Sequence, residues 1–322
     1  MGEQSLIEVA NLHRRYGDVH AVQGLDFRVR RGEVLGFLGP NGAGKTTTMQ
    51  MICGVLAPSL GTVRIGGVDL LEDPIAAKRQ LGYLPELPPL YREFTVDEYL
   101  RYCAHLHGLR KHAATKAMEE AKARCGLQDT GRRLIGNLSK GYQQRVGIAQ
   151  AIVHSPAVVV LDEPTVGLDP IQIREIRKLM RELGNDHGVI LSTHILPEVQ
   201  AVCDRVQILH EGRLVLDEDL AQLSKNQRPR SIRVKFRRPP SRTALTGIAG
   251  VVGRVEALDA DTLRLHHADD ESLSERIVTA SVAGDWGLYE LVSESRSLEE
   301  IFIELTFGEG RGRHDQEPGA GT

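Results

Sequence analysis

Gly39-Pro40-Asn41-Gly42-Ala43-Gly44-Lys45-Thr46 is the stretch that decides the fold of this chain. It matches the G-x-x-x-x-G-K-[ST] pattern of a phosphate-binding loop. The apolar run Val34–Leu38 before it predicts a buried strand, and the residues after it predict a helix that ends near Gly54. Strand, glycine-rich loop and helix are the context that such a loop requires. We therefore interpret the stretch as a phosphate site rather than as an empty glycine-rich turn.

Each fixed position of this loop has a chemical role. Glycines let the backbone curl so that several N–H groups converge on one phosphate, and the following helix adds the positive end of its dipole. Lys45 is predicted to reach the outer phosphates of a nucleotide during catalysis, and the Thr46 hydroxyl is predicted to ligate Mg²⁺. The predicted nucleotide-binding residues of the loop are Gly39, Pro40, Asn41, Gly42, Ala43, Gly44, Lys45, Thr46 and Thr47.

Two later strand ends carry polar side chains that suit the same site. The β-branched run at 157–161 predicts a parallel strand buried on both faces, and Asp162 and Glu163 follow at its carboxyl end. Open α/β sheets bind their ligands at that edge. Asp162 is therefore predicted to hold Mg²⁺ through water, and Glu163 to polarise the attacking water. The next buried run, 189–192, leads to His194, which is predicted to contact the γ-phosphate.

Composition limits the class of protein. The chain has 322 residues, of which 41% are hydrophobic and 26% charged, as in ordinary globular proteins with room for two domains. The net charge of −3 gives no sign of the basic face that nonspecific nucleic-acid binding needs. The four cysteines are scattered, which argues against a disulfide framework or a zinc site. With neither a signal peptide nor a run near the roughly 18 apolar residues of a membrane span, the chain is expected to be cytoplasmic.

The sequence predicts two domains and a tail. The first covers residues 1–222, with a mostly helical subdomain at about 87–150 in which Thr95 and Glu98 have capping-box spacing. The second, 223–307, has the order β-α-β-β-α-β of a small ferredoxin-like α+β unit, and it begins with a polar linker at 223–230. Residues 308–322 are predicted to be a disordered tail.

The motifs in their order resemble those of the ATP-binding subunit of an ATP-binding cassette (ABC) transporter, over roughly residues 5–220. The resemblance implies an α/β fold with a P-loop NTPase core of the ABC type, and ATP and Mg²⁺ as cofactors. Tyr16 alone is a packed or exposed loop aromatic, but in this family its position offers a face on which adenine stacks. The residues that carry the resemblance are Tyr16, the phosphate loop, Glu86 at the Q-loop position, the signature (138–144), Walker B (158–163), the D-loop (167–169) and the switch residue His194.

Finer features are similar to the ABC-2-type export subunits, particularly the gliding-motility-associated branch. They are the signature Leu-Ser-Lys-Gly-Tyr-Gln-Gln, the Q-loop Tyr-Leu-Pro-Glu and the C-terminal extension. The resemblance implies two ATPase subunits that face head to tail, so that Ser139 and the Gly141 backbone contact the γ-phosphate of the opposite site. ATP would close this dimer and hydrolysis would release it.

The resemblance also implies partners and a location. An integral-membrane permease subunit and a second ATPase subunit, expected to form a homodimer, are the implied partners, and nucleic acid is not among them. The permease would hold this chain on the inner face of the cell membrane.

Two positions depart from the family pattern. Glu86 replaces the usual glutamine, and we expect its carboxylate to remain functional as a metal ligand. Lys140 replaces the usual glycine of the signature, and its side chain could face either solvent or a phosphate.

Two other functions remain open to this chain. Soluble ABC ATPases that act on ribosomes or DNA usually carry two cassettes or long coiled-coil insertions, whereas this sequence has one phosphate loop and a short helical segment. A nucleotide-binding regulator without turnover would not need Lys45, Asp162, Glu163 and His194 together. The ATPase of an exporter is therefore the favoured interpretation.

Overall fold

The chain divides into two compact units, Met1–Leu220 and Ala221–Thr322. The computed structural model describes residues 5–226, 231–248, 251–259, 261–267, 272–294 and 298–307. The predicted division after residue 222 falls inside helix α8 (Leu220–Asn226), which spans the boundary between the units. Residues 223–226 of the predicted linker at 223–230 belong to this helix, and the linker itself stays a prediction. Residues 227–230 and the predicted tail at 308–322 lie outside the described residues.

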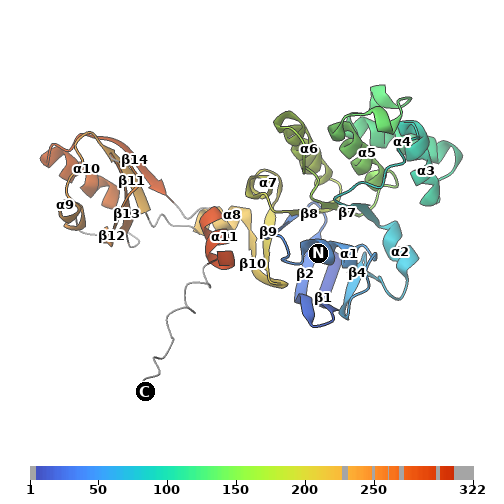
Figure 1. Cartoon of the computed structure of the whole chain (residues 1–322), viewed down its shortest axis with the longest axis horizontal. Coiled ribbons are helices and arrows are strands. Elements are labelled where there is room, and N and C mark those ends of the chain that lie inside the picture. The colour runs from blue at the N-terminus through green and yellow to red at the C-terminus, as the bar shows by residue number, and fades with distance from the viewer. Residues whose placement is uncertain are drawn as a thin grey trace, which may run out of the picture. The chain divides into compact units, whose positions relative to one another are not determined.

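The first unit is built on a six-stranded sheet with the order β10-β9-β3-β8-β7-β6 (Figure 1). Strands β6, β7, β8, β3 and β9 are parallel, and β10 runs antiparallel to β9. Every residue of β3, β7 and β8 is buried, which confirms the three predicted buried strands, and β7 is parallel to its neighbours as predicted. The bounds are β3 Val34–Leu38, β6 Leu81–Leu84, β7 Val158–Asp162, β8 Gly188–Thr193, β9 Arg205–His210 and β10 Arg213–Asp219.

A second, antiparallel sheet of the first unit has the order β2-β1-β4-β5. Its long hairpin joins β1 and β2 through a tight turn, and Tyr16 at the end of β1 pairs with Val19 at the start of β2. Tyr16 was predicted to lie in this turn, and it is instead the last residue of the strand. The bounds are β1 Ser5–Tyr16, β2 Val19–Arg30, β4 Leu60–Ile65 and β5 Val68–Asp69.

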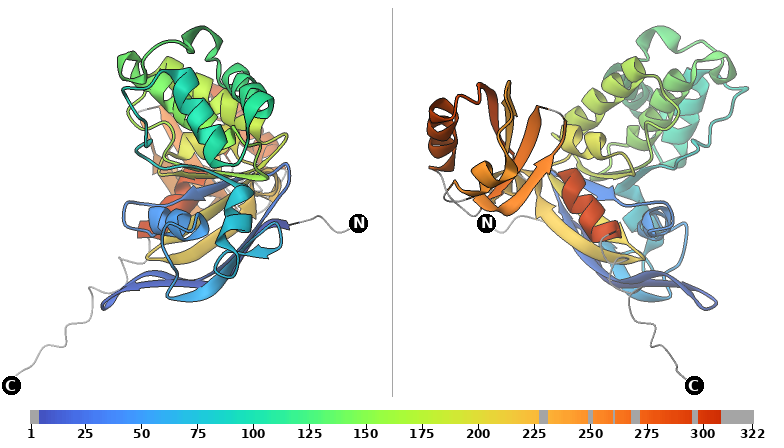
Figure 2. Two further views of the ribbon diagram at one scale, coloured as in Figure 1. Left: turned by 90° about the vertical axis from the view of Figure 1, so that its right-hand side faces the viewer. Right: turned by 60° about the vertical axis from the view of Figure 1, so that its left-hand side comes forward.

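A helical segment separates β6 from β7, as the sequence predicted. It contains α3 (Val96–Leu106), α4 (Lys111–Cys125) and α5 (Lys140–Ile152), with short 3-10 turns before α5. The capping box at the start of α3 is confirmed, because the Thr95 backbone N–H donates to Glu98 at 2.8 Å and Glu98 N–H donates to the Thr95 hydroxyl at 3.3 Å. Figure 2 shows these helices together at one end of the unit, away from the β1–β2 hairpin.

The remaining helices of the first unit connect the strands. α1 (Lys45–Ile52) follows the phosphate loop as predicted, and α6 (Pro170–Leu183) follows the D-loop. The sequence did not predict α2 (Pro74–Arg79) and α7 (Leu196–Val202). The two missed helices have six and seven residues, which is too short to show a helical period in the sequence. Among the described residues, no helix has the length and apolar character that crossing a bilayer requires.

The second unit contains a four-stranded antiparallel sheet with the order β12-β13-β11-β14. Its elements follow the predicted order β-α-β-β-α-β, and the first strand lies between the third and the fourth, as in a ferredoxin-like unit. Apolar side chains of β11, β13, α9 and α10 form a core of its own. The bounds are β11 Ser231–Phe236, α9 Arg242–Thr246, β12 Val251–Ala257, β13 Thr262–His267, α10 Leu273–Ala283, β14 Leu288–Glu294 and α11 Leu298–Phe307.

Candidate nucleotide-binding site

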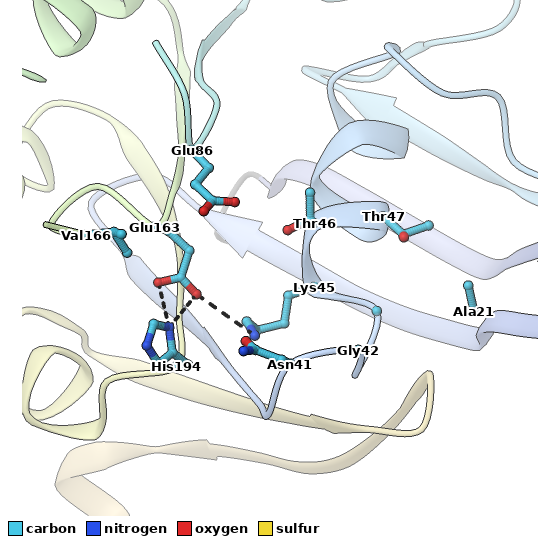
Figure 3. Close-up of a pocket in the computed structure, with 11 residues that line it drawn as sticks. Ala21, Asn41, Gly42, Lys45, Thr46, Thr47, Glu86, Glu163, Val166 and His194 are labelled. Carbon is cyan, nitrogen blue, oxygen red and sulfur yellow. Dashed lines mark hydrogen bonds and ion pairs between the residues drawn. The ribbon is translucent and has the colours of Figure 1, made fainter.

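A pocket of about 290 Å³ lies where the phosphate loop meets the carboxyl ends of the parallel strands. Five parts of the chain form its wall: the start of β2, the phosphate loop with the start of α1, and the segments that follow β6, β7 and β8. Figure 3 shows their side chains pointing into one space. The lining residues are Ala21, Asn41, Gly42, Gly44, Lys45, Thr46, Thr47, Glu86, Glu163, Val166 and His194.

Two glycines of the loop are required by close backbone contacts. A Cβ atom on Gly39 would lie 2.5 Å from the Leu209 carbonyl oxygen, and one on Gly44 would lie 2.5 Å from the Ala21 carbonyl oxygen. Gly44 also has φ of 99°, a backbone conformation that residues with a side chain rarely adopt. These contacts explain why the loop needs glycine at both positions and hold its backbone against the neighbouring strands.

The turn between β9 and β10 supports the phosphate loop from behind. Gly212 N–H donates to the Ala43 carbonyl at 3.1 Å, and Gln23 N–H of β2 donates to the Gly212 carbonyl at 2.8 Å. The Gln23 side-chain amide donates to the Glu211 carbonyl at 2.8 Å. This turn therefore connects the loop to the antiparallel sheet by hydrogen bonds.

Lys45 occupies the centre of the loop. Its ammonium donates to the Gly39 carbonyl at 2.8 Å and to the Pro40 carbonyl at 3.2 Å, and the residue is 6% exposed. Burial lowers the pKa of Lys45, while the carboxylates of Glu163, Asp162 and Glu86 act in the opposite direction. The ammonium thus lies among carboxylates at the place where a phosphate would bring further negative charge.

Glu163 lies between Lys45 and His194. One of its carboxylate oxygens is 4.0 Å from the Lys45 Nζ, and both are hydrogen-bonded to His194 Nδ1, at 2.9 and 3.0 Å (Figure 3). Glu163 has φ of 48°, in the left-handed region that is costly for a residue with a side chain. The structure therefore places the predicted general base and the predicted switch histidine in direct contact.

Asp162 is buried at the end of β7, behind Glu163. Both of its carboxylate oxygens are buried without a hydrogen-bond partner among the described residues. Burial raises the pKa of Asp162, and the charges of Glu163 and Glu86 act in the same direction. The hydroxyls of Ser192 and Thr46 oppose this shift, although neither reaches hydrogen-bonding geometry. A buried carboxylate with free oxygens fits a cation.

The metal site has to be completed by other ligands. The described part of the chain contains no group of three or more His, Cys, Asp or Glu side chains that could hold a metal ion. Mg²⁺ commonly binds through one or two carboxylates together with water and substrate phosphates. Asp162, the Thr46 hydroxyl and Glu86 are therefore the residues that would hold it, and a nucleotide would supply the remaining oxygens.

Several predicted residues lie away from the pocket wall. Gly39, Pro40 and Ala43 belong to the loop but are not among the lining residues. Tyr16 is also absent from the lining; it is 46% exposed, and the Arg14 guanidinium lies 4.6 Å from the centre of its ring. The stacking of adenine on Tyr16 stays a prediction.

The signature residues lie outside the pocket as well. Ser139 is exposed and caps α5, accepting a hydrogen bond from Tyr142 N–H at 3.4 Å. Gly141 lies against Gln172, because a Cβ atom there would be 2.5 Å from the Gln172 Cδ. The Lys140 ammonium lies against Gly167, where a Cβ atom would be 2.0 Å away. Lys140 is exposed, in line with the solvent-facing alternative, and its ammonium also lies against the D-loop of its own chain.

The sequence missed residues that shape the pocket without carrying a chemical signal. Ala21 and Val166 line the wall, yet an alanine in a strand and a valine in a turn have no motif of their own. The fully buried Glu198 was also missed, because it lies in the unpredicted helix α7. Only contacts between distant parts of the chain identify these residues.

Comparisons with known proteins agree with this geometry. The family model described as ABC transporter matches residues 22–166. The bacitracin transport ATP-binding protein BcrA of Bacillus licheniformis is 37% identical over 226 residues, covering 70% of this chain and 73% of the relative. The Nod factor export ATP-binding protein I of Burkholderia orbicola is 32% identical over 302 residues, covering 93% of this chain and 96% of the relative.

A solved structure extends the likeness to three dimensions. The structure of cbiO1 from Clostridium perfringens, part of the ABC transporter complex cbiONQ, matches with a TM-score of 0.63 and 30% identity. The match covers 69% of this chain and 92% of that chain.

Proposed function

We propose, from the premise that this chain belongs to the ATP-binding subunits of ABC transporters, that it powers an exporter of the ABC-2 type through ATP-driven closure of a dimer. The chain is an ATPase, and its hydrolysis of ATP powers a membrane transporter. The export assignment is supported by the Nod factor export protein, which is matched over 93% of this chain. Our placement near the gliding-motility-associated branch rests on the signature and Q-loop residues.

The observation that carries the proposed mechanism is the position of the Glu163 carboxylate, between the phosphate-loop lysine and His194. We assign Glu163 as the base that takes a proton from the attacking water, and His194 as the residue that orients this carboxylate. Lys45 would exchange its bonds to the Gly39 and Pro40 carbonyls for bonds to the outer phosphates of ATP.

Asp162, Thr46 and Glu86 are the residues proposed to hold Mg²⁺. Bound Mg²⁺ would neutralise the charge of the phosphates and of the carboxylates around them. Glu86 adds a negative charge where the family usually has a neutral amide. Two like charges about 4 Å apart cost about 4 kcal/mol at an effective dielectric constant of 20, so the carboxylate at Glu86 favours a site that holds a cation.

The dimer is proposed because the signature does not line the pocket of its own chain. Ser139 is exposed at the start of α5, and its hydroxyl and the following N–H groups can face a phosphate held by another molecule. A second copy, arranged head to tail, would bring its Ser139 and Gly141 to this pocket. ATP bound from both sides would hold the copies together, and its hydrolysis would let them part.

The permease is proposed to dock on an aromatic surface that follows Glu86 in the chain. Tyr91 and Tyr102 are 44% and 39% exposed, with ring centres 5.8 Å apart, and Leu87 is 83% exposed. Because Glu86 lines the pocket and Leu87 is its neighbour, contact there could be transmitted to the nucleotide. The chain would thereby be held at the inner face of the cell membrane. The second unit, none of whose described residues lines the pocket, is proposed to be an accessory domain with a regulatory or dimer-contact role.

Replacing Glu163 tests the catalytic assignment. Glu163→Gln keeps the size of the side chain and removes the base, so hydrolysis should fall by about 10²- to 10⁴-fold, as is typical of lost general-base catalysis. ATP should still bind, and size-exclusion chromatography should show ATP-loaded dimers that persist. Glu182→Gln, the same change on an exposed position of α6, is the matched control. Wild-type turnover in Glu163→Gln would contradict the assignment.

The transport partner is tested by isolation from membranes. The full chain should co-purify with an integral-membrane subunit, and Leu87→Asp together with Tyr102→Asp should release it while ATP binding is retained. Recovery of ribosomal or DNA-bound partners instead would support the soluble alternative.

A further inference from the structure

A strained residue at the centre of the pocket raises the question of what holds it there. Glu163 adopts φ of 48°, and such a conformation persists in a residue with a Cβ only when its surroundings enforce it. Its backbone N–H donates to the Ser192 carbonyl at 2.9 Å, which fixes the start of the segment. The segment that follows carries Val166 on the pocket wall and needs an anchor of its own.

The anchor is a buried carboxylate on α7 that does not line the pocket. Glu198 is fully buried, and one of its oxygens accepts a hydrogen bond from the Thr165 hydroxyl. Its other oxygen accepts from the Thr193 hydroxyl at 2.8 Å. Thr165 and Thr193 are themselves 1% and 0% exposed, so water does not compete for these bonds.

These hydrogen bonds form a closed ring of residues that includes the catalytic pair Glu163 and His194. Thr165 follows Glu163 by two residues, and Thr193 immediately precedes His194. Glu198 joins the two threonines, while the Glu163 carboxylate joins His194 on the opposite side of the ring. Displacing Glu198 would therefore free both segments that carry the catalytic pair.

The same carboxylate has a cationic neighbour on another helix. The Arg177 guanidinium of α6 lies 3.8 Å from the Glu198 oxygen that accepts from Thr165. A charge buried this completely is retained at high cost unless it is bonded and paired. A neutral residue could fill the space, so the carboxylate points to a requirement for two strong acceptors in fixed positions.

We propose that Glu198 is a positioning residue, which holds Glu163 and His194 in their hydrogen-bonded arrangement and thereby sets the rate of ATP hydrolysis without touching the nucleotide. This inference rests on the roles proposed for Glu163 and His194. Loss of Glu198 should lower kcat by about 100-fold, the effect that a small misplacement of a catalytic group can have. ATP binding should be unchanged, because Lys45 and the phosphate loop keep their own contacts.

The test compares Glu198→Ala and Glu198→Gln in the full chain. We expect the larger fall in kcat for alanine, a smaller one for glutamine, which keeps one acceptor oxygen, and a wild-type dissociation constant for a fluorescent ATP analogue in both. Glu33→Gln is the matched control, because Glu33 is also a buried acid, 8% exposed, that accepts from a backbone N–H and an arginine at the far end of β3. Full turnover in Glu198→Ala, or loss of ATP binding, would overturn the proposal.

A double mutant separates positioning from general destabilisation. If Glu198 acts through the catalytic pair, Glu198→Ala combined with Glu163→Gln should be no slower than Glu163→Gln alone, because the carboxylate that Glu198 positions is then already absent. Multiplying effects would mean that Glu198 only supports the fold, and would overturn the proposal. Wild-type turnover in both Glu163→Gln and His194→Ala would instead sink the proposed site roles, and this inference with them.

Two conservative variants provide a second test in case Glu198→Ala fails to fold. Thr193→Val and Thr165→Val each remove one bond to Glu198 and keep nearly the same side-chain shape. Each should lower kcat while ATP binding is retained. Unchanged kcat in both folded variants would refute the positioning role.

Discussion

Helices α1 and α5 both begin where we propose that a phosphate binds, but their first turns are built in different ways. α1 follows Gly44 and has no side chain bonded to its first N–H groups, and its first turn lines the pocket. α5 is capped by its own Ser139 and begins at the surface, away from that pocket. The contrast indicates that the first site is completed within the chain, whereas the second presents its donors to another molecule.

The side chains next to the two helix starts follow the same contrast. Lys45 is buried and bonded to two carbonyls of its own loop, so its position is fixed before any ligand arrives. Lys140 lies against Gly167 on the D-loop, which places the signature and the D-loop together. Removing Lys45 should weaken the binding of ATP to a single chain. Removing hydrogen-bond donors at the start of α5 should affect only dimer formation and hydrolysis, which require two chains.

The largest effect is expected from Lys45→Ala. The change removes the ammonium that would bond the outer phosphates, and hydrogen bonds to charged groups contribute about 1.5–3 kcal/mol each. ATP should therefore no longer bind at concentrations that saturate the wild type, as measured by equilibrium dialysis. Lys78→Ala is the control, because Lys78 also donates to a glycine carbonyl, at 2.9 Å, but outside the pocket. Unaltered affinity in Lys45→Ala would refute the phosphate-loop assignment.

A smaller, selective effect is expected from Ser139→Ala. A lost bond to a charged phosphate should slow hydrolysis by about tenfold, at roughly 1.4 kcal/mol per factor of ten. ATP binding at low protein concentration, where chains are monomeric, should be unchanged. Ser241→Ala removes a helix cap of the same kind from α9, so it controls for the stability that a cap contributes. If Ser139→Ala weakened ATP binding by the monomer, the contrast between α1 and α5 would be broken.

The smallest effect is expected from removing the second unit. A chain that ends after Asn226 keeps α8 whole and retains every lining residue of the pocket. Its affinity for ATP, measured by calorimetry, should match that of the full chain. A folded truncated chain that failed to bind ATP would show that the second unit takes part in the site, and the proposed division into domains would be wrong.

Local signals in the sequence predicted the parts of the fold that depend on neighbouring residues. The phosphate loop, the buried strands β3, β7 and β8, and the capping box of α3 each follow from residue types within a few positions. The order of elements in the second unit could also be predicted from the sequence, because its strands alternate with turns and short helices.

The features that the sequence did not predict depend on distant contacts or on very short elements. α2 and α7 are too short for a period, and α8 extends into residues whose polar composition suggested a linker. The contact between Lys140 and Gly167 and the bond between Thr165 and Glu198 join segments that are far apart in the sequence. Side-chain type alone does not specify such partners.

The support of the phosphate loop by the β9–β10 turn has a consequence for how the first unit assembles. Gln23 and Glu211, which hydrogen-bond beside the loop, are 188 residues apart along the chain. Contacts between such distant residues form late, because a long segment must be ordered before they can exist. During synthesis the loop emerges long before the turn that holds it, so nascent chains carry the motif without its support. The first unit therefore becomes able to bind nucleotide near the end of its folding. Bound ATP would then indicate that the distant segments of this unit have folded together.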